Sequence, residues 1–452
     1  MICAVAFGDR REIIMKNRLC LGVARRIITP PVGCCLAGYA PDVIAEKVND
    51  DLTVTALAFE QNGKKALLVS FTVLSIQTKL ASELRKAIEK EFAIPYEAVI
   101  LHAIHNHSGP NLSGSYGWGD IDDHYLNETL IPGLMESVKE ALGNMRSVTM
   151  AVTAGESLVG INRRERKADN SVRLGQSPWG CFDPQMTVIA FADEENKPVA
   201  NLVHYGCHGT AAGRNHEISR DWAGVMIDTL EAESGAITAF LNGPEGDVGP
   251  RLTSGLTVGK IREGLGDIAY AMRLGAVAGQ DAVKIYNQPK YRTVPEMCVS
   301  AGQTMVPLAP RIPLEAAKEK YEEFRGQTIN IRGRSERHYR QLIESYENGY
   351  KEVEGYPQEQ TILRLGDLAL VCCPYELFSE IGLRVKKDSP APYTLILSNT
   401  NGSEGYYATE TEICRGGYEI DMFLTKYLQP PVPNADWYYI TQTLKNLSKT
   451  EE

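Results

Sequence analysis

Short apolar runs of strand length alternate along this chain with longer segments of helical periodicity, and this alternation is the strongest constraint on its fold. Residues 53–76 hold Asn62-Gly63 between runs rich in Val, Leu and Phe, which predicts a β-hairpin. Residues 78–92 have helical spacing, and residues 96–107 begin as a buried strand. Because hairpins are mixed with strand–helix alternation, we expect an α/β fold in which helices flank a core of mixed β-sheet.

The length and the charge pattern predict how the chain is divided. Its 452 residues are enough for a large core. We expect residues 1–18 to be a leader or a disordered tail, and residues 19–452 to form a single domain. The tract 313–355 is highly charged and helical in pattern, so we expect a helical excursion from that domain.

The overall composition excludes several classes of partner. A net charge of −10 argues against nucleic acid or an anionic membrane as the main partner. No apolar run reaches the roughly 18 residues of a membrane-spanning helix, so integral membrane association is not expected. The ten cysteines include no Cys-x-x-Cys pair, and several lie in apolar runs, which favours reduced thiols and a cytoplasmic location. The sequence leaves the oligomeric state open.

Three of the eight histidines fall within six residues, in the stretch "LHAIHNHSGP". In an extended strand His105 and His107 would share one face, whereas His102 would belong to the buried strand or support the site from behind. Ser-Gly-Pro then breaks the strand, which puts the pair at the rim of the sheet, where sites in α/β proteins usually lie. The pattern is typical either of a metal or catalytic site or of a hydrogen-bonded histidine cluster in a turn.

Two further segments could contribute to the same rim. "VHYGCHGT" closes a strand with His204 and His208, and taken alone this segment favours a structural role over a functional one. "FLNGPEGDVGP" runs from a strand into a loop that holds Asn242 and Asp247. Such a loop could orient a histidine from behind, bind a cation, or be only an acidic turn.

Taken together, these segments resemble one family, the neutral (non-lysosomal) ceramidases, which are zinc-dependent amide hydrolases. The resemblance rests on seven short motifs that occur in the family's order across most of the chain. They are "LGVARRIITPPVGCCLAGYA", "IHNHSGP", "GINRR", "CHGT", "NGPEGDVGP", "LALVCCPYELFSEIGLRVK" and "NGSEGYYATETEICRGGYE".

The resemblance implies a set of site residues, each of which falls on a matching position of this chain. The implied zinc ligands are His105, His208, Glu376 and Tyr406, and Tyr407 is the alternative to the last if the register is shifted by one. The implied catalytic groups are His107 as the proton shuttle, Arg163 for the carbonyl or an acidic substrate group, and Tyr418 as the donor to the oxyanion.

The resemblance implies a zinc-dependent hydrolase that cleaves a C–N amide bond with metal-activated water. The segment 111–125 that follows the histidine motif is polar and carries three Asp, so we expect a small-molecule amide that is smaller and more polar than ceramide. Ester hydrolysis, or lyase or isomerase chemistry, on the same metal site is a second interpretation. A non-catalytic module that binds a metal or a sugar is a third.

Overall fold

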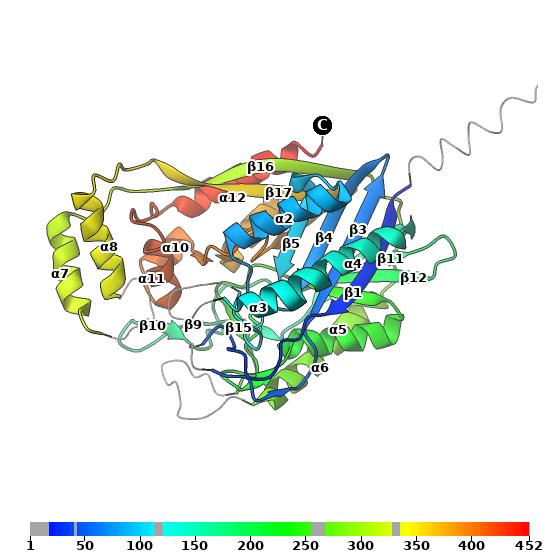
Figure 1. Cartoon of the computed structure of the whole chain (residues 1–452), viewed down its shortest axis with the longest axis horizontal. Helices are drawn as coiled ribbons and strands as arrows, with labels where there is room; N and C mark the ends of the chain where they lie inside the picture. The colour runs from blue at the N-terminus through cyan, green and yellow to red at the C-terminus, as the bar shows by residue number, and fades with distance from the viewer. Residues whose placement is uncertain (1–17, 40–42, 113–120, 255–266, 328–334, 452) are drawn as a thin grey trace, which may run out of the picture.

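The computed structural model describes residues 18–39, 43–112, 121–254, 267–327 and 335–451. Nearly all of the expected leader, residues 1–17, therefore lies outside the described residues. Among the described residues, three larger β-sheets and several two-stranded ladders form the core, with helices packed on the sheets (Figure 1). The prediction of a mixed α/β fold flanked by helices is confirmed, although the strands divide into several sheets.

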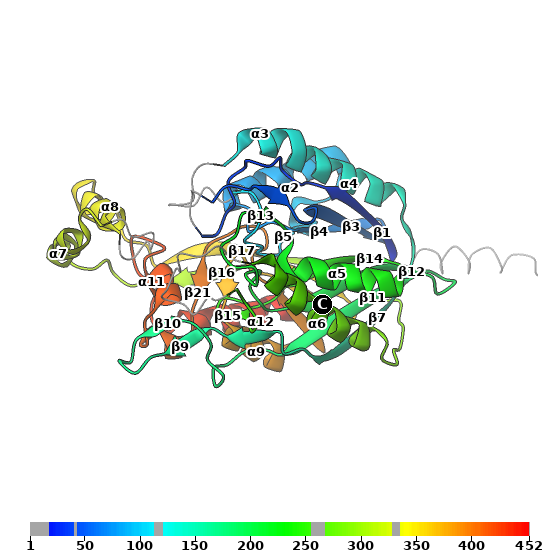
Figure 2. The same ribbon diagram turned by 90° about the horizontal axis from the view of Figure 1, so that it is seen from below.

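The first sheet has the strand order β5-β4-β3-β1-β6. Its hairpin turns at Asn62 and Gly63, both with positive φ, as the sequence predicts. Helices α2 and α4 cover one face of this sheet (Figure 2). The bounds are β1 Cys20–Ile27, β3 Thr53–Gln61, β4 Lys64–Phe71, α2 Thr78–Phe92, η1 Tyr96–Ala98, β5 Val99–Ala103, α4 Ile131–Gly143 and β6 Arg146–Ser147.

The second sheet, of order β14-β12-β11-β7, packs against the other face of the first. Phe59 of β3 and Phe191 of β11 meet there, with ring centroids 5.9 Å apart. Helices α5 and α6 pack against each other and against the far side of this sheet. The bounds are β7 Thr149–Glu156, β11 Gln185–Ala192, β12 Pro198–Tyr205, α5 Asp221–Ser234, β14 Ile237–Asn242 and α6 Ile268–Tyr286.

The third sheet has the order β16-β17-β18-β20 and is buried on both faces. Because side chains alternate along a strand, Leu363 and Leu365 join the core of the first sheet, whereas Ile362 packs toward α9 and α12. The bounds are β16 Met297–Pro307, β17 Gly355–Leu365, β18 Leu368–Cys372, α9 Ser379–Asp388, β20 Tyr393–Leu397 and α12 Ala435–Ser448.

The tract 313–355 connects β16 to β17 and contains two helices, α7 Leu314–Phe324 and α8 Glu336–Glu347. They project from one end of the molecule (Figures 1 and 2). Their apolar residues Ala317, Tyr339 and Leu342 form a small cluster separate from the main core. This agrees with the expected helical excursion, and the rest of the chain supplies the core around the site.

The remaining elements are short and lie mostly in the loops beyond the strand ends. Their bounds are β2 Lys47–Val48, α3 Asp123–Tyr125, η2 Leu126–Leu130, β8 Gly160–Asn162, β9 Arg164–Arg166, β10 Val172–Leu174, β13 Glu217–Ile218, β15 Val248–Pro250, β19 Glu376–Leu377, β21 Tyr406–Tyr407, α10 Glu410–Ile413 and α11 Tyr418–Leu424.

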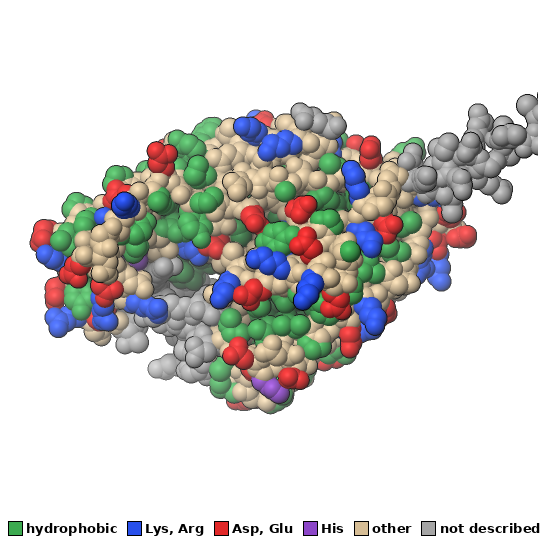
Figure 3. Space-filling view, turned by 45° about the horizontal axis from the view of Figure 1, so that its top comes forward, with side chains coloured by type: hydrophobic (Ala, Val, Ile, Leu, Met, Phe, Trp, Pro, Cys, Tyr) green, Lys and Arg blue, Asp and Glu red, His purple; other side chains and the backbone are tan. Residues whose placement is uncertain are grey.

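Two properties of the molecule bear on its partners. None of the described helices combines the length and the apolar character that crossing a membrane requires. On the face shown in Figure 3, acidic and basic side chains are interspersed, without a broad field of one sign. That pattern agrees with the diffuse acidity of the sequence.

Candidate metal centre

The segments that follow β5, β12, β14 and β19 meet at one place. The Asn242 side chain, at the end of β14, accepts a hydrogen bond from Cys207 N (3.1 Å) and donates one to Ile104 O (3.0 Å). Gly246 N donates to Leu377 O (2.9 Å). These bonds satisfy buried backbone groups that the strands leave unpaired, and they bring the histidine-bearing segments together.

His105 reaches the centre through a turn of the backbone. Strand β5 ends at Ala103, and His105 has a φ of +63°, in the left-handed region that non-glycine residues seldom adopt. Its Nδ1 lies 3.1 Å from Leu74 O. The rings of His105 and His107 are 4.9 Å apart, so they do face each other. Strand alternation is the wrong reason for this, because the turn at His105 produces it.

His208 completes a cluster of three imidazoles. Its Nδ1 lies 2.9 Å from Glu245 O, in the loop after β14, and 3.1 Å from Val248 O, at the start of β15. One ligand atom from each of His105, His107 and His208 lies within 4.8 Å of the others. His204, by contrast, lies within β12 and directs its Nε2 at Ile396 O (2.9 Å).

The hydrogen bonds of these rings decide whether the cluster suits a metal. A carbonyl oxygen can only accept, so Nδ1 of His105 and Nδ1 of His208 carry a proton, and the singly protonated form of each ring presents a lone pair at Nε2. Both Nε2 atoms face Glu376 Oε2, at 3.4 and 3.1 Å. Burial lowers the pKa of His208 to about 3, so this ring supplies no proton at neutral pH. Facing lone pairs and a carboxylate are electrostatically costly unless a cation lies between them, and the donor set fits Zn²⁺.

His107 differs from the other two rings. Its Nε2 lies 3.3 Å from Nε2 of His105, but its Nδ1 has no hydrogen-bond partner among the described residues. Burial, together with the neighbouring histidines, holds the pKa of His107 well below its ordinary value. Nothing in the described fold therefore fixes which nitrogen of His107 carries the proton.

Glu376 and Tyr406 are brought together by a short parallel ladder. Strand β19 pairs with β21 so that Glu376 stands opposite Tyr406. Tyr406 Oη accepts a hydrogen bond from Arg163 Nη2 (2.9 Å). The Tyr407 hydroxyl instead donates to Ala435 O (2.9 Å) within an apolar cluster. The structure thus places Tyr406 beside the histidine cluster and Tyr407 in the core.

Arg163 is held by a carboxylate that the sequence analysis missed. Its Nε donates to Glu419 Oε1 (2.9 Å), and Nη1 of Arg164 donates to Glu419 Oε2 (2.7 Å). Glu419 is 1% exposed, so this ion cluster is shielded from solvent. Its neighbour Tyr418 packs 5.6 Å from the Tyr406 ring. Burial raises the pKa of Tyr418 to about 12, so its hydroxyl keeps its proton at neutral pH. Glu419 was missed because a single acidic residue in the first turn of the short helix α11 carries no sequence signal of burial.

His102 and Asn242 support the centre from behind. His102 lies within β5 and is fully buried, with Nδ1 3.0 Å from Thr400 Oγ1. Its Nε2 accepts a hydrogen bond from Asn242 N (2.8 Å). His102 therefore holds the end of β14, and does not join the three facing rings.

Asp247 supports the carboxylate side of the site. Its Oδ1 accepts from both N and Oγ of Ser379, each at 2.8 Å, at the start of α9. Its Oδ2 accepts from Asn162 Nδ2 (3.2 Å), next to Arg163. Asp247 thus links the loop after β14 to the segments that carry Glu376 and Arg163.

Gly38 and Tyr39 form a wall beside His107 that sequence reasoning did not identify. A Cβ on Gly38 would lie 2.2 Å from Nδ1 of His107, so only glycine fits there. The Tyr39 ring lies 5.2 Å from the His107 ring. The signal was present in the "LAGYA" motif, whose glycine has a φ of +111°.

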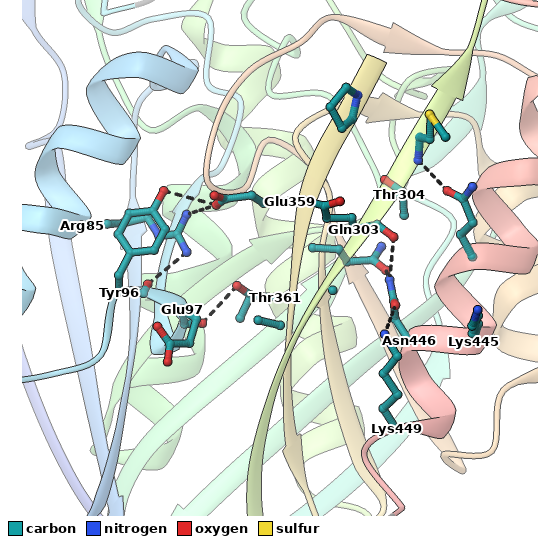
Figure 4. Close-up of a pocket in the computed structure, with 16 residues that line it drawn as sticks. Arg85, Tyr96, Glu97, Gln303, Thr304, Glu359, Thr361, Lys445, Asn446 and Lys449 are labelled. Atoms are coloured by element: carbon teal, nitrogen blue, oxygen red, sulfur yellow. Dashed lines mark hydrogen bonds and ion pairs between the residues drawn. The ribbon is translucent and has the colours of Figure 1, made fainter. Parts of the chain in front are cut away.

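A separate groove of about 700 Å³ crosses β16 and β17 between η1 and α12 (Figure 4). None of the predicted site residues lines it, and its amide side chains are largely engaged in holding α12 to the edge strand β16. Asn446 Nδ2 donates to Gln303 O (3.1 Å) and to Gln360 Oε1 (2.9 Å). Gln442 Oε1 accepts from Met305 N. The groove is therefore a packing feature of α12.

Fold and site together define an α/β protein with a candidate metal centre of histidine and carboxylate at its strand ends. The family model described as neutral/alkaline non-lysosomal ceramidase, N-terminal, matches residues 19–260. The chain belongs to this family, as the sequence motifs predicted. Glu376, Tyr406 and Tyr418 lie beyond the matched range, and the fold places them next to it.

Relatives and solved structures agree with this membership. The chain is 26% identical over 218 residues to neutral ceramidase of Oryza sativa subsp. japonica, and 24% identical over 225 residues to neutral ceramidase 2 of Arabidopsis thaliana. These matches cover 45% and 47% of this chain, but only 28% and 30% of the relatives. The crystal structure of neutral ceramidase from Pseudomonas aeruginosa has a TM-score of 0.72 at 17% identity, over 96% of this chain and 75% of that one. A structure described as ceramidase complexed with C2 matches with the same TM-score at 16% identity, over 95% of this chain and 75% of that one. This likeness shows the fold.

Proposed function

We propose that the chain is a zinc-dependent hydrolase that cleaves the C–N bond of a small, polar amide. The observation that carries the proposal is the convergence of Nε2 of His105, Nε2 of His208 and Oε2 of Glu376, with both histidine Nδ1 atoms tied to backbone carbonyls. Carbonyl partners of this kind are typical of histidines that ligate a metal. Family membership supports amide hydrolysis as the reaction.

In this proposal His105, His208 and Glu376 hold the metal, and Tyr406 completes the set. Zinc bound there would lower the pKa of a water molecule to about 7 and supply a nucleophile at neutral pH. Tyr406 is the least usual ligand, but its pairing with Glu376 in the β19–β21 ladder supports its place in the set. Burial and the Glu376 carboxylate raise the pKa of Tyr406 well above its ordinary value, and the charge of Arg163, which donates to Tyr406 Oη, opposes that rise in the direction that ligation needs.

His107 has the properties of the group that moves the proton. Its Nδ1 has no hydrogen-bond partner among the described residues and its Nε2 lies 3.3 Å from Nε2 of His105, so no described backbone carbonyl holds the proton on one nitrogen of this ring. It can therefore take a proton from the attacking water and deliver one to the leaving amine. His105 and His208 cannot do this without losing their carbonyl bonds.

Tyr418 and Arg163 would act on the carbonyl group of the substrate. Because the Tyr418 hydroxyl stays protonated, it can donate to the oxyanion that forms when the carbonyl is attacked. Arg163, which is held by Glu419, keeps a positive charge beside Tyr406. Both contributions depend on donors that are already in place before the reaction.

The substrate class rests on two observations. The names of the relatives point to N-acylated amides. The polar segment 111–125 favours a molecule smaller and more polar than ceramide, although residues 113–120 lie outside the described residues. We expect no nucleic acid and no integral membrane association.

The test uses N-acyl amino alcohols whose acyl chain lengthens from acetyl to palmitoyl, with the matched esters in parallel. We expect release of a free amine and a carboxylate, fastest with short acyl chains, and loss of activity in His105→Ala. A preference for palmitoyl amides would overturn the proposal of a small, polar substrate but would leave the proposed amidase activity in place. Cleavage of the esters alone would favour ester hydrolysis on the same metal site. If the zinc-loaded chain turned over none of these substrates, the proposal that it is an enzyme of this kind would be overturned.

A further inference from the structure

The start of helix α5 contains a strained and fully buried acidic residue that the proposed mechanism does not use. Asp221 has a φ of +54° and is 1% exposed. Left-handed backbone at a non-glycine residue is disfavoured, and it persists only where the surroundings hold it in place. Such positions cluster at functional sites, so the contacts of Asp221 are informative.

The Asp221 carboxylate is bonded to the backbone that follows His208. Its Oδ1 accepts from Ala211 N (3.0 Å), and its Oδ2 accepts from Ala212 N (2.9 Å). Oδ1 also accepts from Trp222 N (2.7 Å). One buried carboxylate therefore joins the loop after β12 to the first residue of the α5 interior.

The next residue extends this contact to His208 itself. Nε1 of Trp222 donates to His208 O (3.0 Å). The Trp222 ring is fully buried, with the Phe240 ring centroid 5.2 Å and the Tyr205 ring centroid 6.2 Å away. Because this indole is packed on strands β14 and β12, its N–H is held in a fixed position and restrains the His208 backbone.

The same loop also sets the position of the other histidines. Gly209 O accepts a hydrogen bond from His107 N (3.2 Å). A Cβ on Gly209 would lie 2.9 Å from His105 O, so the two histidine segments touch backbone to backbone. A shift of residues 208–212 would therefore change the distances among all three rings.

We infer that Asp221 and Trp222 are positioning residues that fix His208, and through Gly209 also His107, in the geometry of the metal centre. The inference rests on the proposed function, because it assumes that the three rings surround a zinc ion. Neither residue touches the metal or the substrate. Their effect is on the binding of the ion and on the orientation of the rings.

Asp221→Asn and Trp222→Phe test this inference. Asparagine tolerates the left-handed backbone, so the first change removes acceptor oxygen and leaves the conformation accessible. Phenylalanine keeps most of the buried ring and removes the N–H that His208 O accepts. Glu233→Gln is the matched control, since Glu233 lies on the same helix at its exposed C-terminal end and bonds only Asn287 among the described contacts.

Two readouts are measured on the full chain. Competition with a chromophoric chelator gives the zinc dissociation constant of the metal-free protein, and NMR of ¹⁵N-labelled histidine reports the His208 ring without metal. We expect each variant to bind zinc about 10- to 100-fold more weakly, as for other residues that orient metal ligands. We also expect a changed His208 Nδ1 resonance. The control should match the wild type in both.

The outcomes separate this inference from the proposed function. Unchanged zinc affinity and an unchanged His208 resonance in both folded variants would overturn the inference while leaving the zinc hydrolase in place. A wild-type protein that binds no zinc would overturn the proposed function and the metal-binding part of the inference, and the NMR readout would still decide whether Asp221 orients His208. If Asp221→Asn does not fold, Trp222→Phe decides the matter by the same two measurements.

Discussion

At His105 and His208 a backbone carbonyl fixes the proton on Nδ1, whereas His107 has no such partner among the described residues. This difference divides three chemically identical side chains into two that suit metal binding and one that suits proton transfer. The division depends on the carbonyls of Leu74 and Glu245, which are distant in sequence from the histidines that they bond.

Glu419 should be the most sensitive residue that the sequence motifs did not single out. Glu419→Gln leaves Arg163 and Arg164 in a buried site without their shared carboxylate. We expect the free energy of unfolding to fall by about 3 kcal/mol, because the arginines lose their counter-charge. Denaturant unfolding measures this, and kcat should fall as well.

The control for Glu419 is an exposed pair. Glu323→Gln removes the partner of Lys320 on the surface of α7. It should change the free energy of unfolding by less than about 1 kcal/mol. Equal effects of the two substitutions would contradict the account of the Glu419 cluster.

His204 makes a pH-dependent contribution to stability that is separable from the metal centre. Burial lowers its pKa to about 4, against about 6.5 in the unfolded chain. As the pH falls below about 6.5, His204 is protonated in the unfolded state but stays neutral in the folded state. The free energy of unfolding therefore falls by about 1.4 kcal/mol per pH unit down to about pH 4.

A His204→Gln variant should lack this term. Denaturant unfolding of both proteins at pH 7 and pH 5 measures this. Between these two pH values the wild type should lose about 2 kcal/mol more of its free energy of unfolding than the variant loses. Parallel pH profiles of the two proteins would refute the low pKa of His204.

The sequence predicted which side chains would lie near one another better than it predicted the reasons for their positions. The motifs pointed to His105 and His107 through strand alternation, but β5 ends at Ala103 and a left-handed residue turns the ring. Histidine is enriched at positive φ along with Asn and Asp, but only a few per cent of non-glycine residues adopt it, so the sequence does not single out His105 as the turn. Gly38, by contrast, could have been found, since its positive φ and close approach require glycine.

At the scale of elements, the site depends on short ladders that join strand ends. Strands β19 and β21 have two residues each, and yet they set Glu376 opposite Tyr406. Periodicity predicts the long hairpins, because they repeat the alternation many times. It does not predict two-residue ladders, whose pairing is decided by the loops of the complete fold.

The contact of α12 with β16 should contribute to stability without affecting the metal centre. Asn446→Leu removes the hydrogen bonds to Gln303 O and Gln360 Oε1 at a position that is 3% exposed. We expect a loss of about 2 kcal/mol in the free energy of unfolding, since buried polar groups are left unpaired. Zinc content should not change. Lys445→Ala, at an exposed position of the same helix, is the control and should have an effect within about 0.5 kcal/mol. A loss of zinc in Asn446→Leu would contradict the separation of groove and site.

At the scale of the whole molecule, the α7–α8 excursion leaves and rejoins the core at the β16–β17 hairpin, with further contacts to the segment before α12, where Tyr350 Oη donates to Gln429 Oε1 (3.2 Å) and Leu428 packs on the α7–α8 cluster. Pro307 and Gly355 are paired in the β16–β17 ladder, so the chain leaves and returns at neighbouring positions. Replacing residues 312–351 by a short Gly-Asn-Gly turn should therefore leave a protein that unfolds cooperatively and retains its zinc. An aggregated product, or one with no zinc, would show that the excursion is part of the core.

The overall architecture was predictable to the level of class, because alternation of strands and helices implies an α/β fold. The division of the strands into several sheets was not, since sheet boundaries depend on which edges meet. Phe59 and Phe191 pack against each other across two sheets although they are far apart in sequence, and the sequence of neither strand reveals which strand it will contact.

The most direct test of the central claim is the zinc content of the purified full chain after reconstitution and removal of free metal. Mass spectrometry of the metal should find one zinc per chain in the wild type. It should find less than about one tenth of that in His105→Ala and in His208→Ala, which each lose an imidazole ligand. His204→Gln, whose ring faces Ile396 O, should keep the wild-type content. A folded wild-type protein without stoichiometric zinc, or full zinc content in both alanine variants, would contradict the account.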